Sequence, residues 1–164
     1  IFSAWQAIAA AQIANATLVS PFVGRILDFQ QLKENKKVIP ITEDKGVLSV
    51  THIYNYYKKF GHKTQIMGAS FRNKEEVLAL AGCDLLTIAP SLLTELNSSI
   101  DPVTQSLCIE HAKTSPIKEL IIDEASFRWH FNEDEMATIK LREGISQFAK
   151  DTVTLEQLLT KNWL

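Results

Sequence analysis

Residues 18–25 read Leu-Val-Ser-Pro-Phe-Val-Gly-Arg, so an apolar run ends abruptly in a hydroxyl, a proline, an aromatic ring, a glycine and a guanidinium. This pattern is typical of a buried strand with polar side chains at its carboxyl end, where parallel α/β folds bind ligands. A second strand-like stretch, Thr64–Ala69, is followed directly by Ser-Phe-Arg at 70–72. If the two strands are neighbours, Arg25 and Arg72 converge on one point.

Strands and helices alternate around these two stretches. We expect strands at Thr17–Ser20, Thr64–Ala69 and Leu85–Ala89, and helices at Ala4–Asn15, Val50–Phe60, Asn73–Gly82 and Pro90–Leu96. Helix starts are indicated by Ser3, by Ser49 or Thr51, by the pair Asn73 and Glu76, and by Pro90. The polar run 30–46 is expected to be a solvated loop or a short helix. This order predicts βαβ units in a parallel sheet, as in a (β/α)₈ barrel or a doubly wound sheet.

The pattern loosens after Asp101. The aromatic patch 126–130 shows neither strand nor helix period, and Asn132 with Glu135 is expected to cap a further helix. Its inward residues, and those of a final amphipathic piece, are expected to be Met136, Ile139, Leu141, Ile145, Phe148, Leu155, Leu158, Leu159 and Trp163. We expect this helical tail to cover the sheet. Residues 1–3 look like the end of a strand whose beginning is absent.

Composition limits the classes of protein to consider. With 164 residues the chain is about one domain long, and 46% hydrophobic with 22% charged residues is ordinary globular usage. A formal net charge of −2 disfavours a nucleic-acid binder or a protein of anionic membranes, and no stretch is apolar enough to span a bilayer. Cys83 and Cys108 lack metal or redox spacing, which predicts reduced thiols in a cytoplasmic protein.

The two arginines are the main candidates for binding. A guanidinium offers a planar fork of donors that matches phosphate or carboxylate oxygens. Beyond strand ends and near helix starts, Arg25 and Arg72 would form an anion site, with hydroxyl donors from Ser20 and Ser70. The alternative is that each arginine forms an ordinary salt bridge, and the residue pattern leaves both open.

Other chemistry finds little support in the sequence. The four histidines lie in no ligand spacing, and P-loop, GxGxxG, GxSxG and HExxH motifs are absent, so no metal or cofactor is expected. A lysine that attacks carbonyls must lie desolvated on a core element. Only Lys63 starts a strand, at the end opposite Ser70 and Arg72, so no lysine is expected to form a Schiff base.

Longer motifs then become specific. The segments SPFVGRILD (20–28), SVTHIY (49–54), MGASFRN (67–73), LAGCD (80–84) and LTIAP (86–90) resemble transaldolases, and the resemblance extends into the tail around Met136 and Phe148. The chain resembles the C-terminal portion of this family. The resemblance implies that residues 1–164 are a single, incomplete (β/α)₈ barrel domain with three complete parallel strands and a helical C-terminal tail.

The resemblance also implies an activity and a site. Transaldolases transfer a dihydroxyacetone unit from sedoheptulose 7-phosphate to glyceraldehyde 3-phosphate in the pentose phosphate pathway, through a lysine Schiff base and without a metal. Erythrose 4-phosphate and fructose 6-phosphate are the products. By resemblance, Arg25 and Arg72 bind the substrate phosphate with Ser70 beside them, Ser20 contacts sugar hydroxyls, and Phe22 shapes the pocket.

Some family residues are not expected in this chain. The Schiff-base lysine and the acid/base residues would precede Ile1, so no catalytic residue is expected here, and the chain alone is expected to be inactive. Lys45 and Glu135 stand where the family usually has proline. Unpaired strand edges predict self-association. The alternative is a non-catalytic short protein that binds phosphorylated ligands or complements a partner chain.

Overall fold

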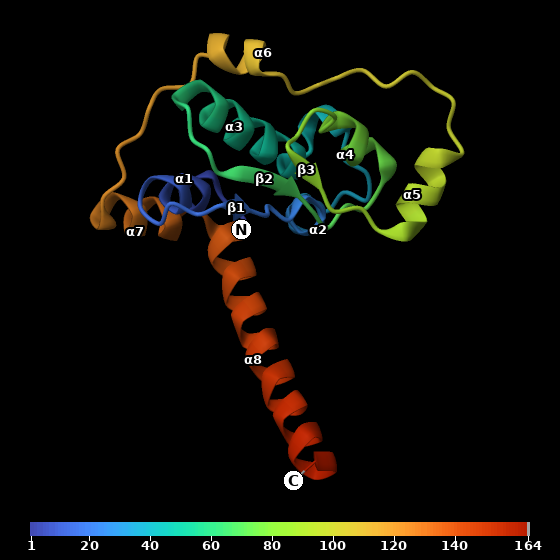
Figure 1. Cartoon of the computed structure of the whole chain (residues 1–164), viewed down its shortest axis with the longest axis vertical. Helices are drawn as coiled ribbons and strands as arrows, with labels where there is room; N and C mark the ends of the chain where they lie inside the picture. The colour runs from blue at the N-terminus through green and yellow to red at the C-terminus, as the bar shows by residue number, and fades with distance from the viewer. Residues whose placement is uncertain (164) are drawn as a thin grey trace.

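The computed structural model describes residues 1–163 and contains a sheet of three short parallel strands (Figure 1). The strands β1 (Leu18–Val19), β2 (Gln65–Gly68) and β3 (Leu85–Leu86) lie in chain order. Leu18 pairs with Gln65 and Met67 with Leu85. A barrel keeps such a sequential order throughout, and each half of a doubly wound sheet keeps it as well, so both predicted folds are compatible with these three strands. The expected α/β class with three parallel strands is confirmed.

Helices connect and follow these strands. Their bounds are α1 (Ala4–Gln12), α2 (Val23–Glu34), the 3₁₀ turn η1 (Ile41–Glu43), α3 (Lys45–Phe60), α4 (Lys74–Ala79), α5 (Pro90–Asn97), α6 (Ile109–Thr114), α7 (Glu124–Glu133) and α8 (Glu135–Trp163). The expected starts at Ser3, Asn73 and Pro90 are confirmed, the first two by capping boxes. None of the helices within the described residues combines the length and hydrophobicity that crossing a bilayer requires.

Two helices near the sheet depart from expectation. The polar run 30–46 is not one loop, because α2 continues through its first residues to Glu34 and ends at Asn35 in the left-handed conformation. The many polar residues of α2 obscure its buried face, which includes Val23 and Ile26. The start of α3 is Lys45 and not Ser49 or Thr51, because the Asp44 carboxylate accepts hydrogen bonds from the first amides of the helix.

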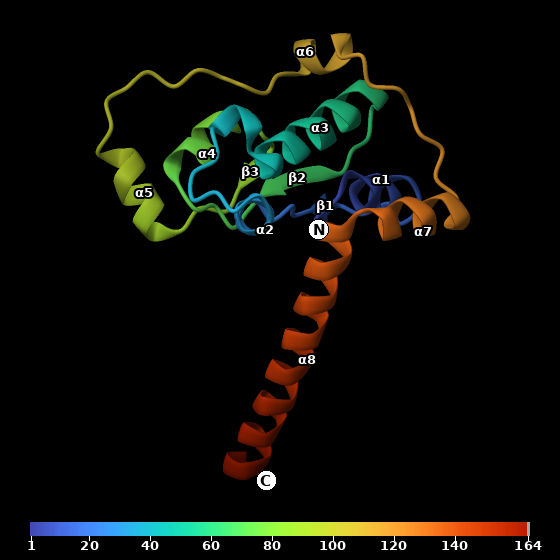
Figure 2. The ribbon, with the colours of Figure 1, turned by 180° about the vertical axis from the view of Figure 1, so that it is seen from behind.

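The main core lies where α3 meets α1 and the strands. Tyr56, Tyr57 and Ile66 are fully buried in it, and the Tyr57 hydroxyl donates to the Ala7 carbonyl at 2.5 Å. α3 also packs against α2 and α6. Both views place α3 and α4 on the same side of the sheet (Figures 1 and 2). The inner face of α3 is therefore buried against β2 and against the helices α1, α2 and α6.

The tail does not cover the sheet, and this expectation was wrong. α8 is one helix of 29 residues that extends away from the sheet and the other helices (Figure 2). Its first turns contact the body, where Ala137 packs with Phe2 and Ile26. Farther along, Ile145 and Phe148 are 61% and 58% exposed, and Leu155, Leu158 and Leu159 are also exposed. The side chain of Trp163 lies outside the described residues.

Two further expectations about the tail, both on where a helix begins, were wrong. The aromatic patch 126–130 is helical, because Asp123 and Ser126 form a capping box that opens α7. Asn132 lies within α7 and caps nothing, whereas the Asp134 carboxylate accepts from the Ala137 amide at 2.9 Å at the start of α8. In both cases an aspartate nearer the helix provides the cap.

The close approach of α2 and α3 yields a stability prediction. A Cβ atom on Gly46 would lie 2.3 Å from the Val23 carbonyl oxygen, whereas one on Gly61 would meet no heavy atom within 4 Å. Gly61→Ala strains only a left-handed helix end and should cost about 1 kcal/mol. Gly46→Ala must push two helices apart and should cost at least about 2 kcal/mol more. Urea unfolding of both variants measures the difference, and equal losses would contradict this contact.

Candidate functional site

The carboxyl ends of β1 and β2 are joined directly by backbone hydrogen bonds. Phe22 forms a parallel bridge with Ala69; the Val23 amide donates to the Ala69 carbonyl at 2.9 Å, and the Ala69 amide to the Pro21 carbonyl at 3.1 Å. On the other side of β1, the Phe22 amide donates to the Ile1 carbonyl at 3.2 Å. The two Ser/Phe/Arg endings therefore lie side by side, as the sequence predicted.

Both serines of the predicted site are held at these ends. The Ser20 hydroxyl donates to the Met67 carbonyl at 3.0 Å, which places it between the two strands. Ser70 has a φ of 68°, a left-handed conformation that is costly for a residue with a Cβ. Such strain concentrates at binding sites, where the surrounding structure holds it. The carbonyl and hydroxyl of Ser70 accept from Arg72 Nη1 at 2.8 and 3.2 Å.

The side chain of Arg72 lies across the first turn of α2. A Cβ on Gly24 would lie 2.1 Å from the Ser70 carbonyl oxygen and 2.8 Å from Arg72 Cγ, so only glycine allows this contact. Arg72 Nε and Nη2 donate to the Asp28 carboxylate, at 3.1 and 2.7 Å. These hydrogen bonds raise the pKa of Arg72 above its ordinary value. Since the two side chains are 41% and 45% exposed, the pair orients the guanidinium more than it stabilises the fold.

Arg25 belongs to the same turn of α2. Its guanidinium carbon lies 4.8 Å from the centre of the Phe22 ring, which in turn lies 5.4 Å from the ring of Phe2. Phe22 precedes α2, and no side chain in the described part of the chain caps this helix start. Arg25 thus belongs to the first turn of α2, and the side chain of Arg72, from the neighbouring loop, contacts the same turn at Gly24. Such a set of donors suits a phosphate group.

The sequence reasoning missed Asp28 as a partner of Arg72. Asp28 lies three residues after Arg25 in α2, and this spacing places a carboxylate on the same helix face. Its pairing with Arg72 depends on the contact between α2 and the loop after β2, which no local pattern indicates. The salt bridge that was left open as an alternative is thus present for Arg72, within the same site.

A buried carboxyl pair lies behind the loop that carries Arg72. Glu76 and Asp44 are 0% and 1% exposed. Burial raises the pKa of Glu76 to about 7, and the neighbouring Asp44 charge adds to this rise. Burial also raises the pKa of Asp44, which its hydrogen bonds from α3 amides oppose. Two ionised carboxylates cannot donate a hydrogen bond to each other, so the pair is favourable when one group carries a proton, and the raised pKa of Glu76 makes Glu76 that group. The sequence had identified Glu76 only as a capping residue.

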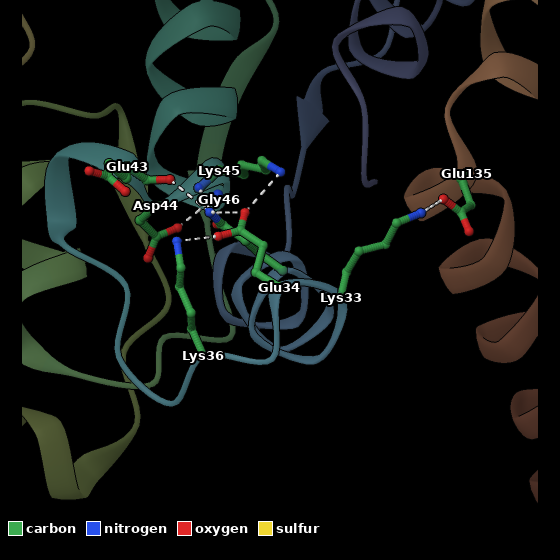
Figure 3. A network of polar contacts seen from close by, with 9 residues as sticks. Lys33, Glu34, Lys36, Glu43, Asp44, Lys45, Gly46 and Glu135 are labelled. Atoms are coloured by element: carbon green, nitrogen blue, oxygen red, sulfur yellow. Dashed lines mark hydrogen bonds and ion pairs between the residues drawn. The ribbon is translucent and has the colours of Figure 1, made fainter.

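Polar contacts fix α2 at its other end (Figure 3). Glu34 accepts from Lys36 at 3.1 Å and from Lys45 at 3.3 Å, which together with Gln30 lowers the pKa of Glu34. Lys33 forms an ion pair with Glu135, which joins α2 to the start of α8 (Figure 3). The buried Gln30 side chain accepts from the Lys45 amide at 2.9 Å and so joins α2 to α3. The buried Gln30 contact therefore joins α2 to α3, the exposed ion pair links it to α8, and its first turn faces the strand ends.

A pocket of about 370 Å³ lies beside this helix but apart from the strand ends. It is bounded by the starts of α1, α3 and α8 and by the middle of α2, and Phe29, Lys33 and Met136 contribute to its walls. None of the five predicted site residues lines it. The chemistry of the strand ends, and not this hollow, therefore defines the candidate site.

Comparison with known proteins agrees with this architecture. Residues 1–159 match the family described as Transaldolase/Fructose-6-phosphate aldolase. The probable transaldolase of Drosophila melanogaster is 55% identical over 159 residues, which cover 97% of this chain and 48% of that protein. The transaldolase of Rattus norvegicus is 53% identical over 161 residues (98% and 48%), and that of Homo sapiens is 54% identical over 164 residues (98% and 48%).

The chain belongs to the transaldolase/fructose-6-phosphate aldolase family. It spans about half the length of the curated relatives it matches. Since the family fold is a (β/α)₈ barrel, the three parallel strands and their helices are part of such a barrel.

The carboxyl pair yields a prediction on the pH dependence of stability. A folded pKa of about 7 against an ordinary value of 4.5 means that the native state keeps a proton which the unfolded chain loses. Glu76 therefore stabilises the fold fully below pH 4.5, and this contribution is lost as the pH rises to about 7. Relative to Glu76→Gln, the parent chain should lose about 3 kcal/mol over this range. Urea unfolding at several pH values tests this, with the exposed neighbour in Glu75→Gln as the control; parallel profiles for parent and Glu76→Gln would contradict it.

Proposed function

We propose that residues 20–25 and 69–72 form the phosphate-binding part of a transaldolase site, with Arg25 and Arg72 as the phosphate ligands. The observation that carries the proposal is the direct joining of the two strand ends, from Val23 to Ala69, which brings both arginines to the first turn of α2. Relatives named as transaldolases align with 97–98% of the chain, which supports the proposal.

The proposed reaction is the transfer of a dihydroxyacetone unit from sedoheptulose 7-phosphate to glyceraldehyde 3-phosphate, a transferase activity. The phosphate group is far from the reacting carbon, so binding it holds the sugar in place while the bond changes occur elsewhere. Ser70 would donate beside the arginines, Ser20 would contact sugar hydroxyls, and Phe22 would form a wall. Asp28 keeps the guanidinium plane of Arg72 oriented before the substrate arrives.

The attacking amine is proposed to come from outside this chain. Among residues 1–163, no lysine lies at the carboxyl end of a strand. Lys58 pairs with Asp84 at 2.6 Å, and Lys59 donates to the Ser115 and Ile117 carbonyls. Lys63 precedes β2, at the end of the sheet opposite Arg72. Residues 1–164 would then be one incomplete barrel domain of a cytoplasmic enzyme that needs no metal or cofactor.

Binding of fructose 6-phosphate to the 164-residue chain tests the proposal. Arg25→Ala and Arg72→Ala should each weaken binding at least about tenfold, because each removes charge-assisted hydrogen bonds to the phosphate. Arg128→Ala provides a matched control, since Arg128 is exposed on α7 and pairs only with Glu124 among the described residues. Isothermal titration calorimetry measures the affinities. Unchanged affinity in both site variants would refute the phosphate site.

Transfer assays separate the catalytic from the non-catalytic alternative. Dihydroxyacetone transfer by the 164-residue chain alone would refute an external nucleophile. Transfer that appears only after adding the amino-terminal half of the Drosophila melanogaster relative would support it. Binding with no transfer in either mixture would favour a short protein that only binds phosphorylated ligands.

We also infer self-association through the free edge of the sheet. β3 lies at the edge, and its Leu85 side chain is 40% exposed. An exposed apolar edge strand offers unpaired backbone groups to a second chain. The apparent mass in light scattering should rise with concentration, and Leu85→Lys should reduce this rise. A monomer at all concentrations would contradict the inference.

A further inference from the structure

Glu76 connects the Arg72 backbone to the interior of the molecule. Its Oε2 accepts from the Arg72 amide at 2.5 Å and from the Asn73 amide at 3.4 Å. Its side chain is fully buried although it belongs to α4, a helix of only six residues. The last backbone amide of the strained 70–72 loop is therefore hydrogen-bonded to a buried carboxyl group. The position of that carboxyl affects where the Arg72 side chain begins.

The second carboxyl oxygen of Glu76 is buried as well. Oε1 is enclosed and meets no N–H donor among the described residues. Its neighbour is the carboxyl of Asp44, whose Oδ1 already accepts from the Gly46 and Val47 amides at 2.8 and 3.2 Å. A proton on Oε1 that is donated to Asp44 satisfies both groups. The negative charge then rests on Asp44, where the N-terminus of α3 favours it.

The charged groups of the surrounding elements do not replace this proton. From η1, Glu43 is exposed, and from α5, Glu95 pairs with Lys74 at 3.9 Å on the outer face of α4. The guanidinium of Arg72 itself turns toward Asp28 on α2. Among the described residues no lysine or arginine forms an ion pair with Asp44 or Glu76. A shared proton is therefore the interaction that can satisfy both carboxyl groups at this place in the interior.

We infer that the buried Asp44–Glu76 pair is a positioning device for Arg72, which ties the 70–72 loop to the start of α3 and so sets the reach of the guanidinium. The inference rests on the proposed function, because Arg72 must bind an anion for its position to matter. Ionisation of Glu76 would place two negative charges side by side in the interior, and the carboxyl would have to move away. Anion binding by Arg72 should then weaken as the pair loses its proton.

Sulfate is the suitable probe, because it remains a dianion over the pH range in which phosphate itself titrates. For the parent chain we expect sulfate affinity to fall at least fivefold between pH 6 and pH 8.5, measured by NMR from the shift of the Arg72 Nε–H signal. Glu76→Gln should bind within twofold of the pH 6 parent value at both pH values. Its amide can still accept from the Arg72 amide and donate to Asp44.

Two further variants complete the series. Glu76→Ala removes both connections and should weaken sulfate binding at least tenfold at pH 6, whereas Glu75→Ala, an exposed neighbour on α4, should match the parent. If Glu76→Ala fails to fold, the contrast between parent and Glu76→Gln decides. Hydrogen exchange of the Arg72 amide gives a readout without ligand: exchange should accelerate in the parent at pH 8.5 and stay slow in Glu76→Gln.

The outcomes separate this inference from the proposed function. If the parent binds sulfate with an affinity that does not change with pH, and Glu76→Gln behaves identically, the inference is wrong and the phosphate site stands. If sulfate does not bind to the parent at either pH, the phosphate site is wrong. The inference is then judged on the Arg72 amide, and equal exchange in parent and Glu76→Gln at pH 8.5 overturns it.

Discussion

The hydrogen bond from the Val23 amide to the Ala69 carbonyl joins the start of α2 to the end of β2, and each predicted site residue lies within three residues of Val23 or Ala69. Because α2 begins where β1 ends, this bond brings the first helical turn against the loop that follows β2. Gly24 makes the contact possible, since any side chain at this position would collide with the Ser70 carbonyl. The strand register and the absence of a Cβ at Gly24 therefore determine where the backbones of Arg25 and Arg72 lie.

Two pairs of ionisable groups near this contact differ in burial and therefore in their electrostatic effect. Asp28 and Arg72 form an ion pair that is about half exposed, so water and salt screen it, and it acts mainly on orientation. Asp44 and Glu76 lie where water does not reach, so ionisation of both would be costly, and the pair retains a proton. Asp28 thus orients the guanidinium of Arg72 at the surface, and Glu76 holds the backbone amide of Arg72 from the interior.

The direction of the C-terminal helix α8 depends on few contacts with the rest of the described chain. α8 contacts the body through Ala137 and its neighbours, which pack on Phe2 and Ile26. The exposed ion pair from Lys33 to Glu135 adds little to this attachment. Farther along α8, apolar residues such as Ile145, Phe148 and Leu155 are exposed, and the chain spans about half the length of its relatives. The periodicity of α8 indicates a helix with an apolar face, but not the surface on which that face lies.

Features that depend on neighbouring residues in the chain could be read from the amino-acid order. This class includes the helix caps at Ser3 and Asn73, because a capping hydrogen bond spans only a few residues. It also includes the apolar strands and their polar endings, namely Ser20, Phe22, Arg25, Ser70 and Arg72. Contacts between distant residues required the folded chain. The pairing of Arg72 with Asp28, the proton between Glu76 and Asp44, and the direction of α8 all join segments that only packing brings together. Charges and apolar faces have many possible partners along a chain, and burial selects among them.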